Sequence, residues 1–140
     1  MPSRESQSVG RRIEVAGLTA LGDAVAATRR YASDHLLGPR DEARLCIIVE
    51  ELITNLIEHG GADIERPIGI DLGRARDAVT LVIEDEGRGF DPRDLPDGNT
   101  IPDRGGGAGL RLVAAWSEVV GYERDGGRNR LKLVVPLSDR

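Results

Sequence analysis

Three polar residues, Glu51, Asn55 and His59, follow one another at intervals of four within a strongly apolar stretch. This interval stacks their side chains along one side of a helix, because an α-helix turns once every 3.6 residues. A carboxylate there can accept a proton, and a neighbouring amide can bind Mg²⁺ through its oxygen while its NH₂ group reaches a phosphate oxygen. The same residues also fit an ordinary solvent-exposed face that ends before Gly60. By itself this row, which we call the polar ridge, leaves both interpretations open.

A second carboxylate, Asp85, closes the apolar run at 78–85. In a strand, alternate residues share a face, so Asp85 belongs to the same face as Val79, Leu81 and Ile83. Burying an unpaired carboxylate is costly, and we therefore expect a hydrogen-bond donor opposite Asp85. The plainer alternative is that strands often end in Asp because turns begin there.

Three glycine-rich clusters, at 87–89, 105–109 and 126–127, raise the question of phosphate binding. The only lysine, Lys132, lies in a predicted strand, which excludes a Walker A loop. The dinucleotide pattern G-x-G-x-x-G fails as well, because Leu110 stands where its last glycine is required. A nucleotide would have to bind by another scheme.

Such a scheme follows from the residues that remain. Gly105, Gly107 and Gly109 remove side chains where a loop would close over phosphates. A helix that starts near Gly109 would direct its free N–H groups toward the same phosphates. This arrangement needs no lysine.

The adenine ring and the metal ion can be placed in the same scheme. Asp85 would accept a hydrogen bond from the exocyclic amine of adenine, and Asn55 would hold Mg²⁺ against the phosphates. Gly87 and Gly89 would let the backbone approach the adenine ring. Each motif is weak alone, but their order along the chain makes the combination specific.

The elements that position these groups follow from hydrophobic periodicity. Helices gathered early and strands mostly in hairpin order indicate an α+β two-layer sandwich, a mixed, largely antiparallel sheet covered on one face by helices. The run at 86–106 has no periodicity and is predicted to be a long loop. In chain order we expect a strand at 12–16, helices at 19–37 and 41–59, strands at 68–72 and 78–85, a helix at 109–117, and strands at 118–124 and 129–137.

The length and composition limit the possible functions. With 140 residues, we expect a flexible N-terminus at 1–10 and a single domain at 11–140. A net charge of −5 and 3% aromatic residues argue against a nucleic-acid partner. No segment is long enough to span a membrane and no signal peptide is evident, so we expect a cytoplasmic protein. Cys46, the only cysteine, is expected to be a buried thiol, and one cysteine with two histidines disfavours a zinc enzyme.

Taken together, the motifs resemble the ATP-binding domain of the GHKL superfamily, the Bergerat fold of gyrase B, Hsp90, histidine kinases and MutL. The resemblance covers residues 12–137 and is closest to the anti-sigma factor serine kinases of the SpoIIAB and RsbW type. It is carried by three boxes, Glu51-x-x-x-Asn55-x-x-x-His59-Gly60, Asp85-x-Gly87-x-Gly89-Phe90 and Gly107-Ala108-Gly109-Leu110.

The resemblance implies roles for these residues. Glu51 would be the general base, Asn55 the Mg²⁺ ligand and Asp85 the residue that binds adenine. Residues 91–106 would form a mobile lid over ATP. The rest of the nucleotide site would be formed by Gly87, Gly89, Gly105, Gly107, Gly109 and Leu110.

The chain departs from the family pattern at two places. Many members have Thr near the start of the last strand, where this chain offers Asn129 for a secondary contact with adenine. Some kinases of the group have Arg two residues before the first glycine of the last box, where this chain has Gly105, with Arg104 one residue earlier. The second departure leaves the expected nucleotide binding intact and bears on phosphoryl transfer.

The leading hypothesis is an ATP- and Mg²⁺-dependent protein serine kinase of the anti-sigma type. By resemblance its partners would be a sigma factor or an analogous regulator, and a STAS-type antagonist that it phosphorylates. The resemblance also implies a homodimer built on the first strand and the first helix. The alternative is a partner-binding switch that uses ATP only as a conformational ligand. A detached catalytic half of a histidine kinase is disfavoured, because no phospho-acceptor hairpin precedes the domain.

Overall fold

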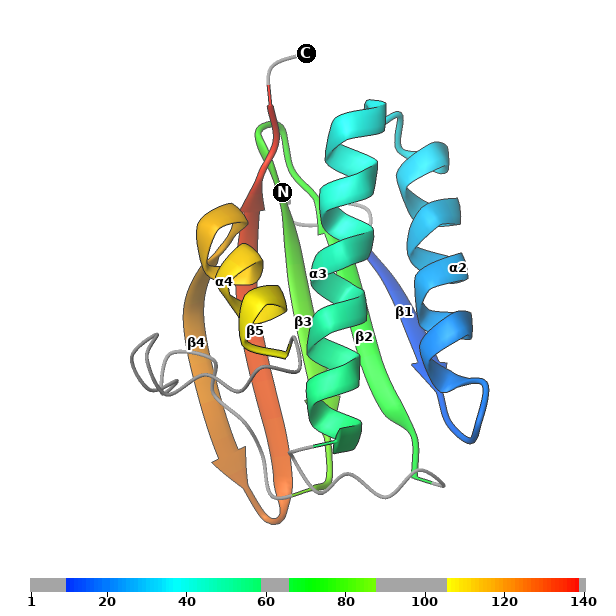
Figure 1. Ribbon diagram of the computed structural model, residues 1–140, viewed down its shortest axis with the longest axis vertical. Coiled ribbons are helices and arrows are strands. Elements are labelled where there is room, and N and C mark those ends of the chain that lie inside the picture. Colours follow the sequence, from blue (N-terminus) through cyan, green and yellow to red (C-terminus); the bar gives the residue numbers. More distant parts are fainter. Residues whose placement is uncertain (1–9, 59–65, 88–105, 139–140) are drawn as a thin grey trace, which may run out of the picture.

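The computed structural model describes residues 10–58, 66–87 and 106–138 (Figure 1). Within these ranges the chain forms one sheet and three helices. None of the described helices is both long and apolar enough to cross a membrane. The elements in chain order are β1 (Gly10–Val15), α2 (Ala20–Asp34), α3 (Pro39–Glu58), β2 (Ile68–Arg74), β3 (Ala78–Asp85), α4 (Gly106–Trp116), β4 (Glu118–Asp125) and β5 (Arg128–Pro136).

The sheet has the strand order β1-β2-β3-β5-β4, and all four neighbouring pairs are antiparallel. Helix α4 carries the chain from β3 across to β4, and the β4–β5 hairpin then places β5 between them. As a result β3 and β4 run in the same direction without pairing. The predicted two-layer α+β fold is therefore confirmed, but the described sheet is antiparallel throughout, so the expectation of a mixed sheet was wrong.

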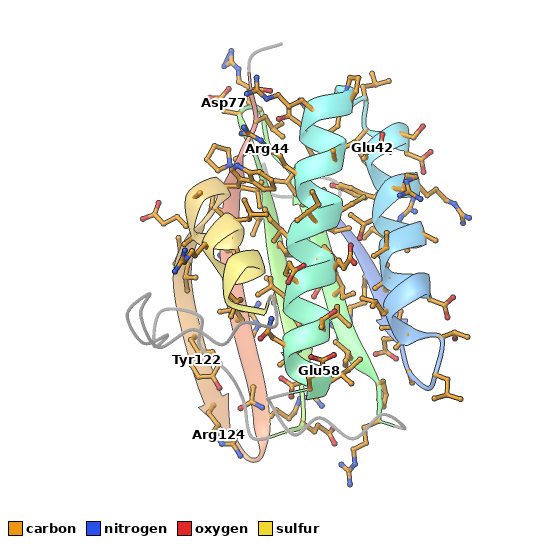
Figure 2. All side chains as sticks on the ribbon, viewed as in Figure 1. Glu42, Arg44, Glu58, Asp77, Tyr122 and Arg124 are labelled. Carbon is orange, nitrogen blue, oxygen red and sulfur yellow. The ribbon has the colours of Figure 1, made fainter. Side chains whose placement is uncertain are left out.

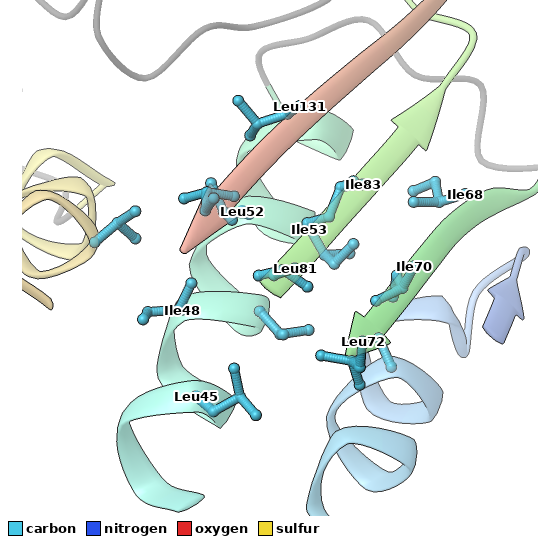
Figure 3. Packing of buried hydrophobic residues seen from close by; sticks show 14 of the residues in the cluster. Leu45, Ile48, Leu52, Ile53, Ile68, Ile70, Leu72, Leu81, Ile83 and Leu131 are labelled. Carbon is cyan, nitrogen blue, oxygen red and sulfur yellow. The ribbon is translucent and has the colours of Figure 1, made fainter. Parts of the chain in front are cut away.

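Helix α3 is the central element of the helical layer, flanked by α2 and α4 on the same face of the sheet (Figure 1). The apolar stripe predicted for this helix faces the sheet and is buried against β2, β3 and β5 (Figure 3). Burying one such aliphatic side chain stabilises the fold by about 1.5–3 kcal/mol. The helix is thus fixed along most of its length by Leu45, Ile48, Val49, Leu52, Ile53 and Leu56.

Helix α2 buries part of the stripe that the sequence indicates. Of the residues at helical spacing, Leu21, Val25, Thr28 and Ala32, the last two are buried and the first two are half-buried. The buried residues of the helix are Ala20, Ala24, Thr28, Tyr31 and Ala32, and the Thr28 hydroxyl donates to the Ala24 carbonyl at 2.8 Å. The alanines let the backbone of α2 approach its neighbours closely, and Tyr31 supplies most of the buried side-chain volume.

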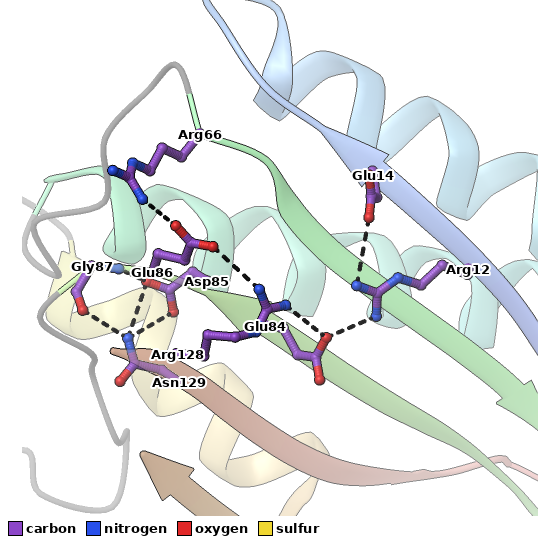
Figure 4. Close-up of polar contacts among 9 residues, drawn as sticks. All are labelled: Arg12, Glu14, Arg66, Glu84, Asp85, Glu86, Gly87, Arg128 and Asn129. Atoms are coloured by element: carbon purple, nitrogen blue, oxygen red, sulfur yellow. Dashed lines mark hydrogen bonds and ion pairs between the residues drawn. The ribbon is translucent and has the colours of Figure 1, made fainter. Parts of the chain in front are cut away.

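The other face of the sheet carries charged side chains in place of a helical layer (Figures 1 and 4). Arg12 of β1 pairs with Asp71 of β2 at 2.8 Å and with Glu84 of β3 at 3.0 Å. Glu84 also pairs with Arg130 at 3.2 Å and with Arg128 at 3.5 Å. We call this face the ion-pair face and the opposite one the helix-covered face.

Candidate functional site

A pocket lies on the helix-covered face, between the C-terminal half of α3 and strands β3, β4 and β5. In Figure 2 it is found at the end of the molecule where Tyr122, Arg124 and Glu58 lie, opposite Asp77. Its walls are mostly aliphatic, and a carboxylate and an amide supply its polar groups. The pocket is lined by Leu52, Leu56, Ile83, Asp85, Tyr122, Asn129 and Leu131.

Asp85 is the charged group of this pocket, and its residue is only 3% exposed. The Gly87 N–H donates to its Oδ2 at 2.7 Å, and the Asn129 amide nitrogen lies 3.3 Å from the same oxygen (Figure 4). The expectation that a donor faces this carboxylate is confirmed. Because the Gly87 N–H binds Oδ2, Oδ1 keeps acceptor capacity for a ligand.

Asn55 is also buried, at 2% exposure. Its amide nitrogen donates to the backbone carbonyl of Glu51 at 2.7 Å, one turn earlier in α3. This bond uses one of the two amide donors inside the helix. The amide group is thereby held with its oxygen as the group suited to a metal ion.

Glu51 is half-buried beside this amide. Burial raises the pKa of its carboxyl, and the nearby carboxylates Glu50 and Glu58 raise it further. Its carboxylate lies directly against the backbone of Gly109 in α4, where an added β-carbon would overlap it. The fold therefore brings the polar ridge of α3 into contact with the first turn of α4.

The last motif box, Gly107-Ala108-Gly109-Leu110, lies in helix α4. Helix α4 begins at Gly106, three residues before the predicted start, so Gly107 and Gly109 both belong to its first turn. Gly109 and Leu110 are buried. The lid predicted for residues 91–106 falls outside the described residues except for Gly106. Gly105 is part of that range, and two further residues of the predicted motifs, His59 and Gly89, also lie outside the described residues.

The sequence did not identify Tyr122 and Arg124 as site residues. Both donate to the side-chain amide oxygen of Asn129. The Tyr122 hydroxyl lies 3.3 Å from this oxygen, and the Arg124 guanidinium lies 2.6 Å from it. Alternation along the predicted strand puts these two residues on one face, which was the available indication. That this face meets Asn129 depends on the pairing of β4 with β5.

The helix layer, the antiparallel sheet and a buried carboxylate at the end of a pocket define a two-layer α+β domain with a candidate binding site on its helix-covered face. The family described as the histidine kinase-like ATPase domain matches residues 15–135, and the chain belongs to this family. It is thus a GHKL-type ATPase domain, and family membership implies that it binds ATP. No curated protein sequence matches the chain.

Two solved structures share the fold. The histidine kinase domain of the Erythrobacter litoralis EL346 blue-light activated histidine kinase is 19% identical, with a TM-score of 0.52 over 86% of this chain and 60% of that one. A longer form of the same kinase is 19% identical, with a TM-score of 0.54 over 86% of this chain and 41% of that one. The chain thus spans less than two thirds of the length of each of these two structures.

Proposed function

We propose that this chain is an ATP- and Mg²⁺-dependent protein serine kinase of the anti-sigma factor type. The proposal rests chiefly on the Glu51 carboxylate, which is half-buried and lies one helical turn from Asn55 and against the start of α4. This position suits a base that acts at the phosphate end of a nucleotide bound in the pocket. The resemblance of the three motif boxes to the SpoIIAB and RsbW type supports the same class.

The residues that line the pocket suit the adenine base in their chemistry. Its aliphatic walls, among them Leu52, Ile83 and Leu131, suit a flat apolar ring. Adenine has an amine where guanine has a carbonyl, so an acceptor such as Asp85 favours adenine and leaves guanine with two facing acceptors. We therefore assign selection of the base to Asp85.

The described residues also fit Mg²⁺ bound largely through phosphates. Among them no three His, Cys, Asp or Glu side chains are gathered so as to hold a metal ion. Mg²⁺ usually keeps a few protein ligands and takes the others from phosphates and water. The Asn55 oxygen would be the protein ligand, and its tie to the Glu51 carbonyl keeps it oriented.

The proposed chemistry is transfer of a phosphoryl group to a serine. Bound ATP supplies the γ-phosphoryl group, and Mg²⁺ offsets the charge on its oxygens. The seryl oxygen forms the new bond to phosphorus, the bond to the ADP oxygen breaks, and the seryl proton passes to Glu51. Burial assists this step, because a raised pKa makes the Glu51 carboxylate a stronger base.

The partners of the proposed kinase are a sigma factor or an analogous regulator, and a STAS-type antagonist that receives the phosphate. These partners follow from the family resemblance. We also propose a homodimer through β1, which is an edge strand of the described sheet. Light scattering that gives a mass near 15.1 kDa, the mass of one chain, at micromolar concentration would reject the dimer.

The proposal is tested by capturing the partner with and without ATP and Mg²⁺, then mapping phosphoserine on the captured chain. The Glu51→Gln variant should bind ATP within a few-fold of wild type and lose roughly 100-fold or more of the transfer rate. Asn55→Ala should instead lose the Mg²⁺-dependent part of ATP binding. Glu42→Gln is the matched control, since Glu42 lies on the same helix and its charge is not among those that raise the pKa of Glu51.

Two results would contradict the kinase proposal. Transfer at the wild-type rate by Glu51→Gln would remove Glu51 as the base. If neither wild type nor Glu51→Gln labels a partner that both bind only with ATP, the chain acts as the non-catalytic switch.

A further inference from the structure

Three residues that face one another across neighbouring strands form a polar row at the end of the pocket. Asp85 of β3 is paired with Asn129 of β5, and Asn129 is paired with Arg124 of β4. The row thus places an amide between a carboxylate and a guanidinium. Its central residue is buried, at 2% exposure, so its hydrogen bonds must be met inside the protein.

The Asn129 amide uses each of its hydrogen-bonding positions on a protein group. Its nitrogen lies 3.3 Å from an Asp85 carboxylate oxygen and 2.9 Å from the Gly87 carbonyl oxygen, as Figure 4 shows. Its oxygen accepts from Arg124 at 2.6 Å and from Tyr122 at 3.3 Å. An amide has two N–H donors and two acceptor lone pairs, so none is left for a ligand.

The orientation of this amide is determined by its surroundings. If it were rotated by half a turn, its oxygen would face the Asp85 carboxylate and the Gly87 carbonyl, which are both acceptors. Its NH₂ group would then face the Arg124 guanidinium, which only donates. The reversed amide would leave several buried groups unsatisfied, and each such group costs about 1–3 kcal/mol.

Arg124 acts on Asp85 by two routes. Through the amide, it fixes which end of Asn129 faces the carboxylate. It also donates to the Gly87 carbonyl at 3.0 Å, and the N–H of Gly87 is itself a donor to Asp85 at 2.7 Å. Removing the guanidinium therefore loosens both groups that hold the carboxylate in place.

We infer that Asn129 and Arg124 are positioning residues that set the base selectivity of the pocket through Asp85. This inference rests on the proposed role of Asp85 as the group that binds the adenine amine. It gives Asn129 a different role from the direct adenine contact expected from the sequence. Asp85 Oδ1 lies 3.4 Å from the Asn129 amide nitrogen, farther than Oδ2 lies from the Gly87 N–H, and would be the acceptor left for the exocyclic amine.

The inference is tested by comparing affinities for ATP and for purine riboside triphosphate, which lacks the exocyclic amine. Calorimetry should show a preference for ATP in the wild-type chain. Arg124→Ala should reduce that preference about fivefold, because an exposed guanidinium contributes less than a buried one. Arg124→Lys should restore part of it, because an ammonium can still donate to one of the two oxygens.

Two further variants separate positioning from general stability. Tyr122→Phe removes one donor to the Asn129 oxygen and should lower the preference by a smaller factor than Arg124→Ala. Arg130→Ala is the matched control: it removes an arginine next to Asn129 in β5 whose partner, Glu84, lies on the ion-pair face. It should leave the preference unchanged, and melting temperatures confirm that each variant is folded.

The results distinguish the inference from the proposal beneath it. An unchanged preference in folded Arg124→Ala and Tyr122→Phe, together with its loss in Asp85→Asn, overturns the positioning role and keeps Asp85 as the base-selecting residue. An unchanged preference in Asp85→Asn overturns the assignment of Asp85 itself. A graded loss from Tyr122→Phe to Arg124→Ala, with Arg124→Lys between Arg124→Ala and wild type, supports the inference.

Discussion

Neighbouring acids on β3, Glu84 and Asp85, lie on opposite faces of one sheet and have opposite kinds of surroundings. Glu84 on the ion-pair face lies within 3.5 Å of three arginines, and its side chain is 20% exposed. Asp85 on the helix-covered face is 3% exposed and has a backbone N–H and an amide as donors. Arginine side chains satisfy Glu84, and neutral donors satisfy Asp85.

This difference indicates what each face does. The arginines around Glu84 leave it little capacity for a further partner, so the ion-pair face contributes to stability and solubility. Neutral donors hold Asp85 in place and leave part of its acceptor capacity for an incoming group. We therefore expect substitutions on the helix-covered face to change binding and catalysis, and those on the ion-pair face to change stability.

The two faces share one structural feature, a glycine that leaves room for a charged group. An added β-carbon at Gly109 would overlap the Glu51 carboxylate, and one at Gly69 would overlap the Arg12 guanidinium. In both cases the obstructed atoms end a flexible side chain, so the chain can fold if that side chain moves. Each glycine therefore matters more for the position of the neighbouring charged group than for the stability of the fold.

The largest effect is expected from Asp85→Asn, which should weaken ATP binding roughly 100-fold. An asparagine has only one acceptor atom, whereas the site needs acceptors for the Gly87 N–H, the Asn129 amide and the adenine amine. Calorimetry with ATP and GTP measures the change. Asp71→Asn, the same substitution on the ion-pair face, is the control and should leave ATP affinity unaltered.

Next in size is Gly109→Ala, which should slow phosphoryl transfer about tenfold by displacing the Glu51 carboxylate. The melting temperature should stay constant or rise, because alanine is the better helix former by roughly 0.5–1 kcal/mol. Gly69→Ala displaces Arg12 in the same way and should leave transfer unchanged. Equal losses of the transfer rate in both variants would mean that the position of the Glu51 carboxylate does not determine this rate.

Local features of this fold were predictable from the sequence. The strand at 78–85 has the predicted bounds, and α3 at Pro39–Glu58 differs from the prediction by two residues at its start and one at its end. Glu51 and Asn55 are one turn apart because the helix period alone determines their spacing. Their roles in catalysis and metal binding stay predictions.

The features that depend on register were not predictable. Asn129 contacts Asp85 across 44 residues of sequence. The alternation of residues within β3 and β5 does not indicate that these two strands are neighbours. The contact of Arg124 with Asn129 follows from that order, because β4 pairs with β5 alone. The burial of Ala20 and Ala24 in α2, ahead of the larger Leu21 and Val25, was missed for a similar reason, since burial of alanine is decided by the neighbouring elements.

A smaller effect, on stability alone, is expected from Glu84→Gln. Burial by itself would raise the pKa of Glu84, but the hydrogen bond to Arg12 and the charges of Arg12, Arg128 and Arg130 lower it overall. A lowered pKa contributes stability above the unfolded-state value, and this stability is lost as pH falls through the folded-state value. The variant should be less stable by about 1 kcal/mol at neutral pH. Urea unfolding at increasing NaCl concentration should shrink the difference.

The smallest effect, and of opposite sign, is expected from Glu51→Gln. Burial and the charges of Glu50 and Glu58 raise the pKa of Glu51, so the ionised side chain costs stability that the protonated one does not. The stability of the protonated form is fully present below the unfolded-state pKa and is lost as pH rises through the folded-state pKa. Glu51→Gln should therefore be slightly more stable than wild type at neutral pH, and the two should converge in acid.

Unfolding curves of wild type, Glu51→Gln and Glu84→Gln from neutral pH into the acid range provide the measurement. The two variants should depart from wild type in opposite directions at neutral pH, and both differences should disappear in acid, where neither glutamate is charged. If Glu51→Gln gains stability while it loses phosphoryl transfer, the ionised Glu51 carboxylate destabilises the fold and is needed for the reaction. If Glu51→Gln is destabilised at neutral pH as Glu84→Gln is, then Glu51 stabilises the fold as an ion, and the proposed contrast between the two faces is wrong.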